Sequence, residues 1–65
     1  ELDKAIEVFK INTQLFPDIA NTYDSLAEAY MNKGNKELAI ENFKKVLQIM
    51  PQNENAKRML EELSK

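Results

Sequence analysis

Apolar residues recur every three or four positions along most of the chain, and two prolines and one glycine divide this pattern into four segments. Such spacing is typical of helices that bury one face. Pro17 and Pro51 interrupt helices because proline lacks the amide hydrogen, and Gly34 can adopt the left-handed backbone that ends a helix. The pattern therefore predicts an all-α chain of about four helices.

The ends of the first two helices can be placed from the residues that flank them. The first helix should stop near Leu15, because Pro17 disfavours helical backbone in the residue before it. The second should begin after Asp18, whose carboxylate can accept the free amides of a first turn. It should end at Gly34.

The last two helices each follow an asparagine. Asn35 is predicted to cap the third helix, with Glu37 near its positive end, and Pro51 follows its last turn. Asn53 is predicted to cap the fourth helix. The residues of this fourth helix expected to point inward are Ala56, Leu60 and Leu63.

The same residue types return after 34 positions, and a fixed period of this length indicates stacked helical repeats. The pairs at this offset are Ala5 and Ala39, Ile6 and Ile40, Phe9 and Phe43, Pro17 and Pro51, and Leu26 and Leu60.

The stretch from Ala20 to Pro51 resembles one tetratricopeptide repeat, and the full repeat would take about residues 20–53. The matching residues, in order, are Tyr23, Leu26, Ala27, Tyr30, Gly34, Ala39, Phe43, Val46 and Pro51. Val46 stands where the family usually has alanine, and Tyr23 stands where tryptophan is common. The resemblance implies an antiparallel helix-turn-helix stack. In its core, Ala27 and Ala39 let two helices approach closely, and Tyr23, Tyr30 and Phe43 fill the gaps between helices.

The resemblance also divides the chain, which we expect to form a single domain over 1–65. Residues 1–17 resemble the second helix of a preceding repeat, although Asn12 replaces a small residue there. Residues 18–52 form the complete repeat. Residues 53–65 resemble a following first helix that closes the stack, with two polar residues, Lys57 and Ser64, in place of its aromatics. The chain starts inside a helical pattern, so we expect it to be a piece of a longer protein.

Composition argues against catalysis. The chain has no cysteine and no histidine, which excludes a disulfide, a Cys/His zinc site and a histidine base. Ser25 and Ser64 lie in predicted helices without the turn that exposes a nucleophilic serine. Asp24 and Glu28 are one helical turn apart and are interpreted as a solvated acidic stripe. We therefore expect no enzyme activity, no metal, no cofactor and no small-molecule substrate.

The charge balance also restricts the partners. Nine basic and eleven acidic residues give a net charge of −2, and the basic residues are scattered, which argues against nucleic acid. No apolar run approaches the roughly 20 residues that cross a bilayer. The expected partner is a protein or a peptide, and the residues do not indicate a compartment.

In the tetratricopeptide-repeat family the first helix of each repeat lines a concave groove that holds a peptide. Carried onto this chain, the resemblance gives the groove positions Asn21, Asp24, Glu28, Met31, Asn32, Asn55, Arg58 and Glu62. Amides there could bond a peptide backbone, and the carboxylates would favour a neutral or basic ligand. These acids occupy positions where a clamp for a terminal carboxylate would need donors, so that ligand is not expected.

Two alternatives stay open. The first helix lacks the partner helix of its own repeat, so the stripe of Leu2, Ile6, Phe9 and Thr13 is predicted to be partly bare. Either the missing helix lies upstream in a longer protein, or another chain covers the stripe as a self-association seam. A homo-oligomer could also arise by straightening the turn at 34–35 and exchanging helices. Separately, residues 21–63 resemble the helical tails that follow hydrolase domains in some bacterial serine hydrolases.

Overall fold

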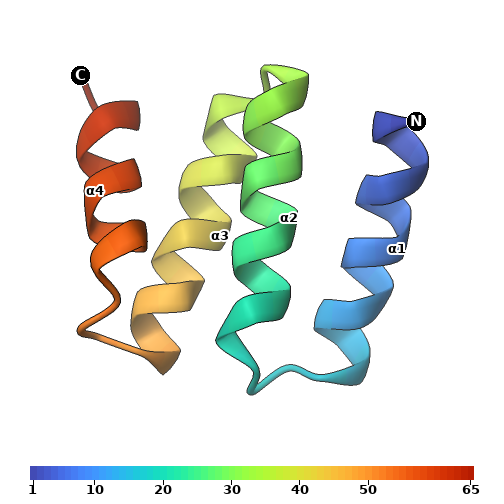
Figure 1. Ribbon diagram of the computed structural model, residues 1–65, viewed down its shortest axis with the longest axis horizontal. Helices are drawn as coiled ribbons and strands as arrows, with labels where there is room; N and C mark the ends of the chain where they lie inside the picture. Colours follow the sequence, from blue (N-terminus) through green and yellow to red (C-terminus); the bar gives the residue numbers. More distant parts are fainter.

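The computed structural model describes residues 1–65 and consists of four α-helices that stand in a row (Figure 1). They are α1 (Leu2–Leu15), α2 (Ala20–Lys33), α3 (Lys36–Ile49) and α4 (Glu54–Leu63). Neighbouring helices run in opposite directions, as the colours from the N-terminus to the C-terminus show (Figure 1). The prediction of an all-α antiparallel stack is confirmed. The extents of 27 × 25 × 14 Å describe a slab, so each end helix has a neighbour on one side only.

The turns that join the helices follow the predicted breakers. Helix α1 ends at Leu15, two residues before Pro17. Gly34 has a φ of 89°, the left-handed conformation that side chains with a Cβ adopt only at a cost. The amides of Gly34 and Asn35 donate to the carbonyls of Met31 and Tyr30, which satisfies the last turn of α2. Two backbone hydrogen bonds therefore close the end of α2 at this tight turn.

Side-chain caps begin two of the helices. The Oδ1 atom of Asn35 accepts the amide of Leu38 at 3.2 Å, and that of Asn53 accepts the amide of Ala56 at 2.9 Å. Both predicted asparagine caps are confirmed.

The predicted Asp18 cap is wrong. Helix α2 begins one residue later than expected, with Ile19 at the cap position and no side-chain bond to the first turn. Asp18 belongs to the turn that starts at Pro17, one position before the cap, so its carboxylate is not placed to accept an amide of α2. Instead the Thr22 hydroxyl donates to the Ile19 carbonyl at 2.7 Å.

The different starts of α2 and α4 predict that substitutions at Asp18 and Asn53 change the stability by different amounts. Asn53→Ala should lower the free energy of unfolding by about 1 kcal/mol, because the amide of Ala56 loses its acceptor. Asp18→Ala, which removes no cap, should change it by less than about 0.5 kcal/mol. Urea titrations of dilute protein followed by circular dichroism would measure both, and equal losses would contradict the assignment of the caps.

The core lies between α2 and α3, which pack against each other over the largest interface. Ten residues are buried, five on α2 and three on α3. Ala27, Ala39, Phe43 and Val46 are fully buried, so the expected close approach of these helices is confirmed. Tyr23 is less buried than expected: it packs at the edge of the core, with the Lys45 ammonium 5.8 Å from its ring centroid.

Position in the row decides how far equivalent residues are buried. Phe43 on α3 is completely buried, whereas Phe9, which stands 34 positions earlier on α1, is only half-buried. Ala39 and Ala5 differ in the same way. The cause is that α3 packs against both α2 and α4, while α1 packs against α2 alone.

Candidate protein-interaction surfaces

Three of the predicted groove residues meet where α2 faces α4. The Asn55 amide on α4 donates to the Asp24 carboxylate on α2 at 3.4 Å. The Arg58 guanidinium donates to the Asn55 side-chain oxygen at 3.1 Å. Asp24 and Asn55 are half-buried, and Arg58 is exposed. We call these three hydrogen-bonded side chains the α2–α4 polar cluster. It brings an acidic and a basic side chain together on one surface.

Two more predicted residues, Glu28 and Asn32, lie toward α1 instead. They line a groove of about 300 Å³ between α1 and α2, together with the apolar side chains of Leu2 and Phe9. Both are exposed on α2, so their polar groups can reach solvent or a ligand. Glu28 lies one helical turn after Asp24 on α2, so this groove adjoins the α2–α4 polar cluster along that helix.

The other three predicted residues are dispersed. Asn21 lines a hollow at the start of α2, beside Ile49 at the end of α3 and Met50 just after it. Met31 is half-buried and packs against the core, which leaves little of it for a ligand. Glu62 is exposed on α4. The predicted set therefore does not converge on one pocket.

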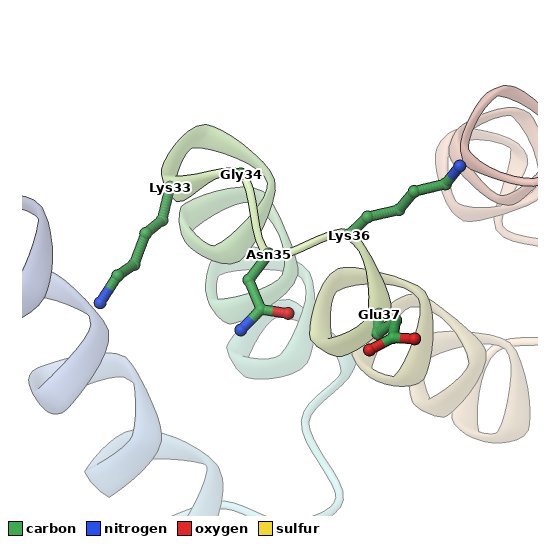
Figure 2. A pocket seen from close by; sticks show the side chains of 5 residues that line it. All are labelled: Lys33, Gly34, Asn35, Lys36 and Glu37. Carbon is green, nitrogen blue, oxygen red and sulfur yellow. The ribbon is translucent and has the colours of Figure 1, made fainter.

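No hydrophobic residue lines the hollow at the turn between α2 and α3, and Figure 2 shows how its side chains spread apart. Lys33 extends toward α1, where it pairs with Asp3, while Lys36 extends toward α4 (Figure 2). Asn35 is already engaged in capping α3. Because its charged groups diverge, this hollow does not gather donors around a single ligand.

The predicted self-association seam is not the bare side of α1. Ile6 is 7% exposed and belongs to the core, while Phe9 and Thr13 are half-buried. Leu2, at the start of the helix, is 36% exposed. This stripe faces α2, because α2 is the only helix against which α1 packs. Only Ile6 of the stripe is fully covered, and Leu2, Phe9 and Thr13 keep part of their surface, so the role of the stripe in self-association stays a prediction.

Three of the exposed apolar residues form a second stripe on α1, which the sequence interpretation missed; Phe16, Ile19 and Met50, outside this stripe, are also at least half exposed. Val8, Ile11 and Leu15 are 54%, 52% and 65% exposed. Each follows a member of the first stripe by two residues, which places it about 200° around the helix. We call these three residues the outer α1 stripe. Their recurrence at i, i+3 and i+7 was the available signal, since α1 is apolar along two opposite faces.

The described side chains offer little to a catalytic mechanism. No group of three or more potential metal-ligating side chains gathers anywhere. Every buried side-chain nitrogen and oxygen has a hydrogen-bond partner, and none of the ten buried residues is polar or charged. None of the four helices combines the length and the apolar character that crossing a bilayer requires.

A comparison with protein families gives one match, to a family described as tetratricopeptide repeat, over residues 20–53. The matched segment runs from the first residue of α2 to the cap of α4, and it takes up just over half of the chain. A comparison with curated proteins finds no match. The division of the remaining residues into half-repeats at 1–17 and 53–65 stays a prediction.

Proposed function

Because the chain belongs to the tetratricopeptide-repeat family, we propose that it is a module that binds a partner protein through an extended segment laid across α2 and α4. Tetratricopeptide repeats generally mediate protein–protein interaction or scaffolding and are generally not catalytic. The observation that supports this particular surface is the α2–α4 polar cluster, in which Asp24, Asn55 and Arg58 are joined across two helices.

The charges around the cluster favour a basic segment. Asp24 is flanked by Glu28 one turn along α2, and Glu62 lies one turn after Arg58 on α4. These three carboxylates outnumber the single guanidinium, so the surface attracts positive side chains more than negative ones. Asn55 already uses its amide and its oxygen within the cluster, which leaves the charged groups at its two ends to meet a ligand.

The cluster also links the two helices of the surface. The Asn55–Asp24 bond joins α2 to α4, which make little other contact with each other and are each placed by their packing against α3. A preformed surface lowers the ordering cost of binding, although a single repeat offers a short one. We therefore expect modest affinity and selectivity by charge.

The test is a titration of the isotope-labelled chain with short extended peptides that match in length and differ only in charge. Basic peptides should shift the amide resonances of α2 and α4, and acidic peptides of the same length should not. The double substitution Asp24→Lys with Glu28→Lys should weaken basic-peptide binding by about tenfold or more, because it removes two attractive charges and adds two repulsive ones.

Glu41→Lys with Glu37→Lys is the matched control. Both residues are exposed acids on α3, one turn apart, so this pair makes the same change in net charge away from the proposed surface. It should leave binding within about twofold. Equal weakening by the two double variants would show that net charge alone attracts the peptides, and absence of any resonance shift at millimolar peptide would remove the proposal.

A further inference from the structure

The two helices of the proposed binding surface carry the same acid at the same position of the repeat. Glu28 on α2 and Glu62 on α4 are 34 positions apart, which is the period of the repeat. Both are exposed, and neither takes part in the one salt bridge of the structure, between Lys33 and Asp3. The surface therefore has two equivalent and unpaired negative charges, one on each helix.

The charged neighbours one turn earlier on each helix are already engaged. Arg58 stands one turn before Glu62, but its guanidinium donates to the side-chain oxygen of Asn55 at 3.1 Å. Asp24 stands one turn before Glu28, and its half-buried carboxylate accepts the Asn55 amide at 3.4 Å. The two acids of this surface that have no bonded partner are thus Glu28 and Glu62.

The arrangement of the helices sets the distance between these two acids. Helices α2 and α4 run in the same direction, because α3 lies between them in the antiparallel row (Figure 1). The bond between the short side chains of Asn55 and Asp24 shows that the two helices are within side-chain contact, which places their axes about 10 Å apart. Because Glu28 and Glu62 hold equivalent positions on parallel helices, we expect about 10 Å between them as well.

This distance matches one periodicity of an extended chain. A polyproline-II segment has three residues per turn and rises 3.1 Å per residue, so side chains three positions apart lie on one side and about 9 Å from each other. In a β-strand, side chains on one side are about 7 Å or about 13 Å apart, across two or four residues. The two glutamates therefore fit side chains at i and i+3 of a polyproline-II segment better than any pair in a strand.

We infer that the partner segment carries two basic residues three positions apart, one paired with Glu28 and the other with Glu62. This rests on the proposed function and adds to it a required spacing, whereas the charge balance alone favours any positive segment. Because the two acids are identical, the pair of bases fits with the segment laid in either direction. Exposed ion pairs are individually weak, so we expect the selectivity for spacing to be modest.

Titration of the isotope-labelled chain with three short peptides of equal charge tests the spacing. Each peptide carries two lysines in an otherwise uncharged, proline-rich backbone, which favours the polyproline-II conformation, and the lysines stand two, three or four positions apart. The peptide with a separation of three should bind about two- to fivefold more tightly than the other two, because it alone presents both lysines to the glutamates on one side. The amide resonances of Glu28 and Glu62 should shift together.

Two variants of α4 show whether the preference comes from the paired glutamates. Glu62→Lys should abolish it, so that the three peptides bind within about twofold of one another. Glu61→Lys is the matched control, because it makes the same charge change at an exposed acid about 100° around the helix, and it should keep the preference. Equal binding of the three peptides by the wild type, or a preference that survives Glu62→Lys, would overturn the inference and leave the proposed surface for basic segments standing. Failure of all three peptides to bind would remove that surface as well.

Discussion

Phe43→Ala should leave the chain largely unfolded at room temperature, because it removes the largest fully buried side chain of the molecule. Truncating a buried phenylalanine costs about 3–5 kcal/mol, the lost transfer free energy and the cavity left behind both contributing. A chain of this length has roughly 3–10 kcal/mol of total stability. The cost is therefore comparable to the whole stability, and the ellipticity of the variant at 222 nm should fall far below that of the wild type.

Phe9→Ala is the internal control for this prediction, since Phe9 holds the same position 34 residues earlier. It is half-buried, with a helix on one side only, so part of its ring already meets water and the cavity can open to solvent. We expect this variant to remain folded and to lose at least about 1 kcal/mol less than Phe43→Ala in urea titrations. Equal losses would mean that the end of the row is as well covered as its centre.

The contrast between these two residues shows what the sequence could predict. The 34-residue period and the apolar spacing located the four helices and most of the buried residues of α2 and α3, because both signals come from the local chain and both agree. They missed Ala20 and Ala29, which are also buried on α2. The asparagine caps were predictable for the same reason: Asn35 and Asn53 each stand immediately before a helix. Local chemistry and position were sufficient there.

The errors occurred where a tertiary arrangement decides between two local readings. On α1 both stripes have helical spacing, and only the placement of α2 determines that Ile6 is buried while Ile11 is exposed. Asp18 has the chemistry of a cap, but the turn after Pro17 takes up one residue more than expected. The predicted groove residues were assigned by resemblance alone. In the structure, Glu28 and Asn32 line a separate groove between α1 and α2.

The small residues that let the helices approach give the second large effect. Ala39→Leu should lower the free energy of unfolding by about 1–3 kcal/mol or more, because Ala39 is completely buried on α3 and the added carbons have no space. The larger side chain must push α3 away from its neighbours, which also loosens the packing around Phe43 and Val46. Thermal unfolding followed by circular dichroism should show the lower midpoint, by several degrees for a domain of this size.

Ala5→Leu repeats the same substitution at the equivalent position of α1, where the alanine is half-buried and lines the open groove toward α2. The added carbons can enter that groove instead of forcing two helices apart, so the change in unfolding free energy should stay within about 0.5 kcal/mol. The difference in unfolding free energy between the Ala39→Leu and Ala5→Leu variants measures how much of the constraint on Ala39 comes from the packing of α3 between two helices. If both variants lose the same stability in dilute protein, close packing at this position does not depend on a second neighbouring helix, and the explanation given for the exposure of α1 fails with it.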